Sequence, residues 1–311
     1  MSSCEDMLSP TDQEMSTAKD VREIFAERGI RPLKKEGQHF LLDDGIAARM
    51  LEYADVCSED VVLEIGAGVG NLTEKLERRA KKVIAVEKDS RLCEVLRERC
   101  KNAEILQGDI LDIEIPPFNK VVANIPFALS SPITLRLLLF HDFDVAVMMY
   151  QREFAEKMVA KRGEKLRERG KTKKLYGRLS VIVQTLAEVE ILEFVPRRAF
   201  FPQPEVDAAI VRLKPKRVKE LETTAEKTLF ASVVSAAFDN RRKKLKNIPA
   251  FKHIFRHACE SSSTQAEWLR SIADLRPEEL QPAYFVRLSR AIWHLKERSG
   301  KGREWEEGRG G

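Results

Sequence analysis

A hydrophobic run in the middle of the chain ends in side chains that can hold a flat, amine-bearing ring. The segment VVANIPF (121–127) passes from apolar residues to Asn124, Pro126 and Phe127. The amide oxygen of Asn124 can accept an amine hydrogen, Pro126 can fix the backbone, and Phe127 can stack on a base. Taken alone, the tetrapeptide NIPF (124–127) is also what a strand end followed by a proline turn would contain. The surrounding motifs must therefore decide between a binding site and a simple turn.

A glycine-rich segment precedes it. The stretch EIGAGVGN contains Gly66, Gly68 and Gly70, and glycines at a strand end let the backbone pass close to a ligand. The dinucleotide fingerprint is GxGxxG, whereas here the third glycine comes one residue early and Asn71 takes its place. This spacing argues against a pyrophosphate ligand and makes a nicotinamide oxidoreductase a distant alternative.

Two carboxylates follow at the ends of the next expected strands. Glu87 comes 21 residues after Gly66, where an acidic side chain can accept the hydroxyls of a ribose. Asp109 could accept a hydrogen bond from an adenine amine. Either acid alone would be an ordinary exposed one, but together these strand ends describe a pocket for an adenosine without phosphates. S-Adenosylmethionine fits this description.

The elements that must position these side chains alternate between periods of about 2 and 3.6 residues. Strands are expected at 61–66, 82–87, 103–106, 120–124 and 144–150, with helices at 71–80 and 90–100. The strands are too apolar to leave one face in water, which is typical of a parallel sheet covered by helices on both sides. In such sheets ligands bind at the carboxyl ends of the strands. The predicted fold class is α/β.

The pattern changes beyond residue 150. Two more strands are expected at 189–194 and 206–213, and the basic segment 161–174 is expected to be an exposed loop. After them the chain is mostly helical. The predicted organisation is a disordered tail at 1–20, a first domain at 21–216, a helical domain at 217–295 and a loose tail at 296–311.

The order of these motifs resembles that of the class I S-adenosylmethionine-dependent methyltransferases, in which NIPF matches the fourth motif of the enzymes that methylate amines. Four more segments are similar to motifs of the ribosomal RNA adenine dimethyltransferases: KKEGQHFLLDD (34–44), LYGRLSVIVQ (175–184), FFPQPEVDAAIVRL (200–213) and AAFDNRRKKLKN (236–247). This resemblance covers about 30–290. It implies a Rossmann-like, mostly parallel seven-stranded sheet with a smaller helical C-terminal domain.

The resemblance also implies roles for individual residues. Those implied to bind S-adenosylmethionine are His39, Leu41, Gly66, Glu87, Asp109 and Asn124. The implied catalytic residues are Asn124, Pro126, Phe127 and Phe200, the two phenylalanines enclosing a flipped adenine. The Asn124 amide and the backbone carbonyl of Ile125 or Pro126 would accept the two amine hydrogens and hold the nitrogen lone pair toward the methyl group. His39, Phe127 and Ala208 depart from the commoner Asn, Tyr and Ser of that family.

A basic run lies in the helical part of the chain. It consists of Arg241, Arg242, Lys243, Lys244 and Lys246, and the net charge of the chain is +5. Most such runs are solvated faces. Because this one accompanies an adenine-methylating motif, we expect these side chains to contact RNA phosphates and to make the affinity depend on salt.

The implied reaction is methyl transfer from S-adenosylmethionine to N6 of two adjacent adenosines in a hairpin loop near the 3′ end of small-subunit (16S-type) ribosomal RNA. The product is N6,N6-dimethyladenosine, and the partner is that RNA or an immature small subunit during ribosome biogenesis. Two alternatives stay open: a non-catalytic RNA-binding assembly factor, and a large-subunit adenine methyltransferase of the macrolide-resistance type.

The composition indicates where such a protein would work. No stretch reaches the ~18 apolar residues of a membrane span, and the polar start is unlike a signal peptide. The five cysteines form no CxxC pair, as expected for reduced thiols. His253 and His257 lack the glutamate of HExxH, so we expect no metal site. We expect a cytoplasmic monomer without membrane attachment.

Overall fold

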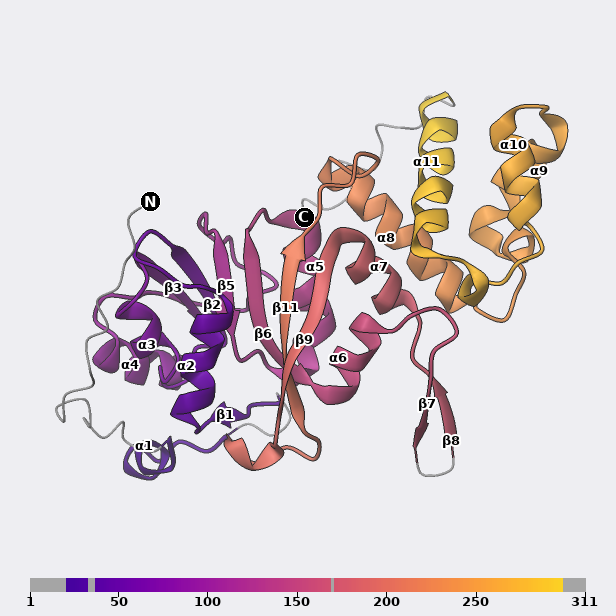
Figure 1. The fold of residues 1–311 in the computed structure, drawn as a ribbon. Helices are drawn as coiled ribbons and strands as arrows, with labels where there is room; N and C mark the ends of the chain where they lie inside the picture. Colours follow the sequence, from indigo (N-terminus) through magenta and orange to yellow (C-terminus); the bar gives the residue numbers. More distant parts are fainter. Residues whose placement is uncertain (1–20, 33–36, 169–170, 299–311) are drawn as a thin grey trace, which may run out of the picture.

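A seven-stranded sheet forms the centre of the computed structural model, which describes residues 21–32, 37–168 and 171–298 (Figure 1). Its order is β4-β3-β2-β5-β6-β11-β9. The strands are β2 (Val61–Ile65), β3 (Lys82–Glu87), β4 (Glu104–Gln107), β5 (Lys120–Ala123), β6 (Val145–Gln151), β9 (Ala187–Val195) and β11 (Ala208–Pro215). The first five are mutually parallel, whereas β11 runs antiparallel to both of its neighbours. The predicted mostly parallel α/β sheet is confirmed.

Helices cover both faces of the sheet. The first three that flank it are α2 (Asp44–Tyr53), α3 (Thr73–Glu77) and α4 (Ser90–Arg99), followed by α5 (Ser130–Phe140), α6 (Arg152–Val159) and α7 (Arg178–Leu186). Successive residues of β5 point to opposite faces: Val121 packs in the core with Leu137 of α5, and Val122 packs with Met50 of α2. All four are almost fully buried. Burial on both faces explains why the strands read as continuous apolar runs.

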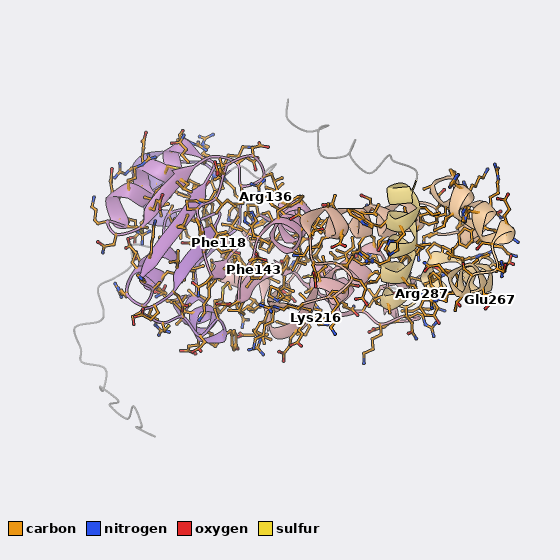
Figure 2. The ribbon with its side chains drawn as sticks, turned by 90° about the horizontal axis from the view of Figure 1, so that it is seen from above. Phe118, Arg136, Phe143, Lys216, Glu267 and Arg287 are labelled. Atoms are coloured by element: carbon orange, nitrogen blue, oxygen red, sulfur yellow. The ribbon has the colours of Figure 1, made fainter. Side chains whose placement is uncertain are left out.

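Beyond β11 the described chain consists of helices joined by turns and loops, with no strand. It contains α8 (Thr224–Asp239), α9 (Lys252–Glu260), α10 (Thr264–Ile272) and α11 (Pro282–Arg298). Thr223 and Glu226 form a capping box that starts α8. Seen from above, Phe118 and Phe143 lie in the sheet part, while Glu267 and Arg287 lie at the far helical end (Figure 2).

The helical part and the sheet part share one core. Phe230 of α8 and Phe285 of α11 belong to the same buried cluster as Tyr150 of β6. Helix α8 packs on α5 and α7, and α11 packs on α7. The division into two domains at residue 217 stays a prediction. The predicted tails at 1–20 and 296–311 lie outside the described residues, except that 296–298 end α11. Among the described helices, none has both the length and the apolar character to cross a membrane.

The expectation of a loop at 161–174 was wrong, because this segment contains a β-hairpin. Strand β7 (Lys165–Glu168) pairs antiparallel with β8 (Lys171–Lys174), and the hairpin projects from the body of the molecule (Figure 1). Eight of the 14 residues are basic, so the apolar alternation that identifies a strand with one buried face is missing.

Three short elements beside the sheet were not expected from the sequence. Strand β1 (Phe40–Leu41) pairs with β10 (Phe200–Phe201), although 159 residues separate Leu41 from Phe200. Helix α1 (Val21–Arg28) packs near this pair, and the rings of Phe25 and Phe40 meet edge to face at 4.9 Å. Two-residue strands carry no periodic signal, so only the folded chain reveals them.

Tyr176 joins the two parts of the molecule and offers a test of this junction. Its buried hydroxyl donates to the carbonyl of Leu280 at 2.9 Å. We expect Tyr176→Phe to lower the free energy of unfolding by about 1–2 kcal/mol, because it leaves a buried carbonyl without its donor. Urea unfolding measures this. Tyr284→Phe, at a side chain 38% exposed, is the control and should change stability by less than about 0.5 kcal/mol. Equal stability of all three proteins would show that the bond contributes nothing.

Candidate active site

A cavity of about 250 Å³ opens at the carboxyl ends of β2, β3, β4 and β5. Most of the residues predicted to bind the cofactor line it: His39, Gly66, Glu87, Asp109 and Asn124. Pro126 lines it as well. The residues come from separate strand ends and meet here because parallel strands present their carboxyl ends at one edge of the sheet.

The glycine loop packs directly against the NIPF segment. Gly66 has a φ of +74°, and a Cβ on it would lie 3.1 Å from Cδ of Pro126. Gly68 has a φ of +61°, and a Cβ there would lie 2.9 Å from Cε1 of Phe40. Both the backbone conformation and the close approach therefore require glycine. The loop and the proline define each other's position.

Glu87 is held by three backbone donors. Its Oε2 accepts from the N–H of Gly68 at 2.9 Å, and its Oε1 accepts from Lys88 and Asp89 at 2.8 and 2.9 Å. Burial raises the pKa of Glu87 above its ordinary value, although these three bonds lower it in part. A carboxylate offers about four acceptor positions, so one remains for a ribose hydroxyl. The three donors fix the direction in which it points.

Asp109 lies at the end of β4 and is more accessible. Its Oδ1 accepts from the N–H of Leu111 at 3.0 Å, and its Oδ2 accepts from Lys88 Nζ at 3.1 Å. The Leu111 N–H, with the Lys88 ammonium, holds the pKa of Asp109 below its ordinary value. An ionised carboxylate at the mouth of the cavity can accept from the exocyclic amine of an adenine.

Asn124 has one satisfied and one unsatisfied end. Its Nδ2 donates to the carbonyl of His39 at 2.8 Å, while its Oδ1 is buried and has no hydrogen-bond partner. The Nδ1 of His39 lies 2.7 Å from the carbonyl of Pro202 and must donate to it, since a carbonyl only accepts. A buried acceptor without a donor costs about 1–3 kcal/mol, so this oxygen needs an explanation. A ligand amine is the partner that its position in the cavity suits.

The sequence left open whether the carbonyl of Ile125 or that of Pro126 is the second acceptor for the amine, and the backbone hydrogen bonds distinguish the two. The Pro126 carbonyl already accepts from the N–H of Leu129 at 2.9 Å. The Ile125 carbonyl accepts from no group within the described ranges, and Ile125 lines the cavity. Of the two carbonyls, that of Ile125 is therefore the better second acceptor for an amine.

The two aromatic residues predicted to enclose an adenine do not stand as a sandwich. The rings of Phe127 and Phe200 are 6.2 Å apart and meet edge to face at 67°. Both side chains are buried and lie in one core cluster. A base between two rings needs parallel planes about 7 Å apart, since each stacked contact takes about 3.5 Å. At least one ring must turn before both can stack on a base.

Leu41 lies beside the cavity rather than in its wall. Its side chain is buried in the same cluster as Phe127 and Phe200, and its carbonyl accepts from Nδ2 of Asn71 at 3.1 Å. The cavity wall also contains residues that the sequence motifs did not indicate, among them Gln38, Phe40, Lys88, Leu92, Ile110, Ala128 and Leu129. Several are immediate neighbours of predicted residues, which was the available signal. Within the described residues, no cluster of three His, Cys, Asp or Glu side chains could hold a metal.

The basic run 241–246 divides into two groups. Lys244 and Lys246 both lie near Asp274, at 2.8 and 2.9 Å. Arg241 pairs with Glu278 at 3.0 Å. Arg242 and Lys243 are exposed and lie on the turn after α8, whereas Lys246 lies in the short 3-10 helix Leu245–Asn247. The predicted RNA contacts of these five residues remain a prediction.

Comparison with known proteins places this geometry in a family. A sequence profile described as "Ribosomal RNA adenine dimethylase" matches residues 33–279. The chain is 44% identical over 261 residues to the "Probable ribosomal RNA small subunit methyltransferase A" of Methanopyrus kandleri. The aligned region covers 83% of this chain and 88% of that protein.

Solved structures of RNA methyltransferases have a similar fold. The crystal structure of a dimethyladenosine transferase from Plasmodium falciparum superimposes with a TM-score of 0.67 at 30% identity, over 84% of this chain and 98% of that one. The 23S rRNA methyltransferase ErmE superimposes with a TM-score of 0.54 at 32% identity, over 81% of this chain and 99% of the other.

Glu64, directly before the glycine loop, predicts how stability depends on pH. It is buried, Thr73 donates to its Oε2 at 2.6 Å, and burial raises its pKa to about 8. The unfolded chain loses this proton near pH ~4.3, whereas the folded chain keeps it up to pH about 8. The folded state thus binds more protons between these values, and stability falls as the pH rises through that window.

We therefore expect wild type to lose on the order of 3 kcal/mol of stability, relative to Glu64→Gln, between pH ~5 and ~8. Urea unfolding at one-unit intervals of pH measures the difference. The control is Glu98→Gln, at a side chain that is 54% exposed, and it should follow wild type. Parallel profiles for wild type and Glu64→Gln would show that Glu64 is ionised in the folded protein.

Proposed function

This chain belongs to the ribosomal RNA adenine dimethylase family, and from this premise we propose that it transfers methyl groups from S-adenosylmethionine to N6 of two adjacent adenosines in small-subunit ribosomal RNA. The target is a hairpin loop near the 3′ end of that RNA, and the product at each position is N6,N6-dimethyladenosine. The observation that carries the proposal is the buried Oδ1 of Asn124, an acceptor without a donor on a residue that lines the cavity of about 250 Å³.

The cavity suits a methyl donor that contains adenosine without phosphates. S-Adenosylmethionine supplies an electrophilic methyl group on sulfur. Glu87 would accept from its ribose and Asp109 from its adenine amine, while the glycine loop lets the backbone approach it. The charged side chains that line the cavity include two carboxylates, Glu87 and Asp109, and one lysine, Lys88. Because the carboxylates would repel a phosphate, this lining disfavours a phosphate-bearing cofactor.

Asn124 and Ile125 would position the nucleophile. The exocyclic amine of adenine is a poor nucleophile because its lone pair is delocalised into the ring. Accepting its two hydrogens at Asn124 Oδ1 and the Ile125 carbonyl would favour a pyramidal nitrogen and direct the lone pair at the methyl carbon. With S-adenosylmethionine bound, an N–C bond would form as its S–C bond breaks, and the amine proton would leave to solvent. No general base is needed, because alkylation makes this proton acidic.

The first methyl group replaces one of the two amine hydrogens. The second transfer therefore relies on a single hydrogen bond, and the fixed backbone around Pro126 must hold the base for it. The target must also leave its stack, so an adenosine in a loop is a natural substrate. For Phe127 and Phe200 to enclose it, at least one of the rings must turn from its present place.

The partner that fits this reaction is the RNA of an immature small ribosomal subunit, with a role in subunit biogenesis. We propose a monomer that acts in the cytoplasm. The likeness to ErmE keeps the large subunit as an outcome to be tested. A non-catalytic assembly factor would not need an unsatisfied acceptor at Asn124, which is why we favour an enzyme.

The role of Asn124 predicts a kinetic defect without a loss of structure. We expect Asn124→Ala to lower the rate of methyl transfer on the order of 10²–10³-fold, as removal of one positioned polar contact does in other enzymes. The measurement is single-turnover transfer to RNA. Asn102→Ala, at an exposed position, is the control and should keep its rate. Turnover of Asn124→Ala near that of wild type would remove Asn124 from the mechanism.

The substrate is tested with ribosomal subunits that lack these methyl groups. Labelled S-adenosylmethionine is incubated with the protein and with purified small or large subunits, and the nucleosides of the product are separated. We expect dimethyladenosine on the small subunit, with up to two modified adenosines per particle. Label on the large subunit would identify the resistance-type activity instead. Tight binding to immature small subunits without label would identify an assembly factor.

A further inference from the structure

The turn after β4 carries Asp109 and is closed by its own hydrogen bonds. The N–H of Leu111 donates to Oδ1 of Asp109 at 3.0 Å. The N–H groups of Asp112 and Ile113 donate to the Asp109 carbonyl at 2.9 and 3.0 Å. An aspartate whose side chain accepts from the N–H two residues on forms an Asx turn, which couples side chain and backbone. The direction of the Asp109 carboxylate therefore depends on where the backbone of Leu111 lies.

Arg136 of α5, labelled in Figure 2, holds the carbonyls of the same turn. Its Nη1 donates to the carbonyl of Leu111, and its Nη2 donates to the carbonyl of Ile113 at 2.7 Å. A guanidinium is a planar, rigid fork, so its two donors fix the two carbonyls relative to each other. Leu111 thus accepts from Arg136 at its carbonyl and donates its N–H to Asp109.

The third donor of Arg136 indicates that these two carbonyls set the position of the side chain. Its Nε is buried and has no hydrogen-bond partner among the described residues. A buried N–H without an acceptor is unfavourable, so this arrangement is not the one that stability alone would select. The side chain gives up one hydrogen bond while it keeps both of its bonds to the Asp109 turn.

The turn transmits its position to the wall of the cofactor cavity. Gly108, Asp109 and Ile110 line that cavity, whereas Arg136 does not. A Cβ on Gly108 would lie 2.4 Å from Cγ2 of Ile113, so the two ends of the turn are in direct contact. The N–H of Gly108 also donates to the carbonyl of Glu87 at 2.9 Å, which joins the turn to the end of β3. Arg136 can therefore act on a ligand only through the turn.

Helix α5 also holds the segment that would position the target amine. It begins at Ser130, directly after the short 3-10 helix Phe127–Leu129. The Oγ of Ser130 donates to the carbonyl of Phe127 at 2.9 Å. Arg136 lies six residues further along the chain, which is about 9 Å along the helix axis. One helix thus contacts the end of the NIPF segment and the turn that carries Asp109.

We propose that Arg136 is a positioning residue for the adenine of S-adenosylmethionine. By holding the carbonyls of Leu111 and Ile113, it directs the Asp109 carboxylate toward the exocyclic amine of the cofactor. The inference rests on the proposed function, in which Asp109 accepts from that amine. It makes α5 the element that sets the distance between the adenine of the methyl donor and Asn124, where the target amine would bind.

The test compares S-adenosylhomocysteine with its analogue in which hydrogen replaces the 6-amino group of the purine. Titration calorimetry gives the affinity of both ligands for wild type, Arg136→Gln and Asp109→Ala. Arg136→Gln should bind S-adenosylhomocysteine about tenfold more weakly, the loss expected for a hydrogen bond to a carboxylate, and should bind the analogue as wild type does. The matched control is Arg270→Gln, which removes an arginine whose Nη1 donates to the carbonyls of Ala258 and Ser261 in the helical part. It should bind both ligands as wild type does.

The double variant Arg136→Gln/Asp109→Ala shows whether the two residues act together. If Arg136 acts through Asp109, the double variant should bind S-adenosylhomocysteine as Asp109→Ala does, within about twofold. An unchanged affinity for the analogue shows in addition that Arg136→Gln is folded. If Arg136→Gln does not fold, Arg136→Lys takes its place, because it keeps a donor and a positive charge, and it should show the same selective loss.

Equal losses for the two ligands, or losses that add in the double variant, would overturn the proposal, because Arg136 would then support the fold and not the direction of Asp109. Wild-type affinity of Arg136→Gln beside a weakened Asp109→Ala would overturn this inference alone and leave the proposed function intact. Wild-type affinity of Asp109→Ala would reject the proposed contact between Asp109 and the adenine amine, and the role of Arg136 with it.

Discussion

The site depends on one hydrogen bond, from Nδ2 of Asn124 to the carbonyl of His39. It fixes the amide of a residue that lines the cavity, and the buried Oδ1 of that amide has no donor from the protein. His39 is itself held by its bond to the Pro202 carbonyl, and the pairing of β1 with β10 brings these two segments together. The segments that contain His39, Asn124 and Pro202 lie far apart in the sequence, and their contacts leave Oδ1 of Asn124 without a hydrogen-bond donor. Folding free energy maintains this arrangement, and a substrate amine would relieve it.

The remainder of the site is built around the same segment. Pro126 packs on Gly66, so the loop that approaches the cofactor and the loop that positions the amine cannot move independently. Glu87 then accepts from the N–H of Gly68, which ties β3 to the glycine loop. The two acids differ in character, because Glu87 is buried and anchored by backbone donors while Asp109 is partly exposed and paired with Lys88. Such fixed acceptors act by position rather than by proton transfer.

The sequence predicts those features that follow from order along the chain. Gly66, Glu87, Asp109 and Asn124 each end one strand of a parallel sheet, so reading the strand ends in turn finds them. Contacts between distant segments leave no such trace. The edge-to-face arrangement of Phe127 with Phe200 arises from packing in a shared core, and neither residue's neighbours indicate it. The hairpin at β7 and β8 was missed because its charged residues lack apolar alternation.

Charge runs are a second case in which sequence and structure differ. The five basic residues at 241–246 look equivalent in the sequence, but Asp274 lies beside two of them and Glu278 beside a third. The structure instead gathers Arg178, Arg242 and Arg276 from three segments around a second cavity, which residues of α7 and of the helical part line. Local charge density therefore identifies the kind of partner, whereas the tertiary structure decides which side chains are free to meet it.

The most direct test of the role of Asn124 is a crystal structure of the protein with S-adenosylhomocysteine and an RNA that carries two adjacent unmethylated adenosines. We predict that N6 of one adenine lies within about 3.2 Å of Asn124 Oδ1, with the Ile125 carbonyl as its second acceptor. An adenine bound in the cavity with N6 directed away from Asn124, and with Oδ1 hydrogen-bonded to water or to another part of the protein, would contradict this.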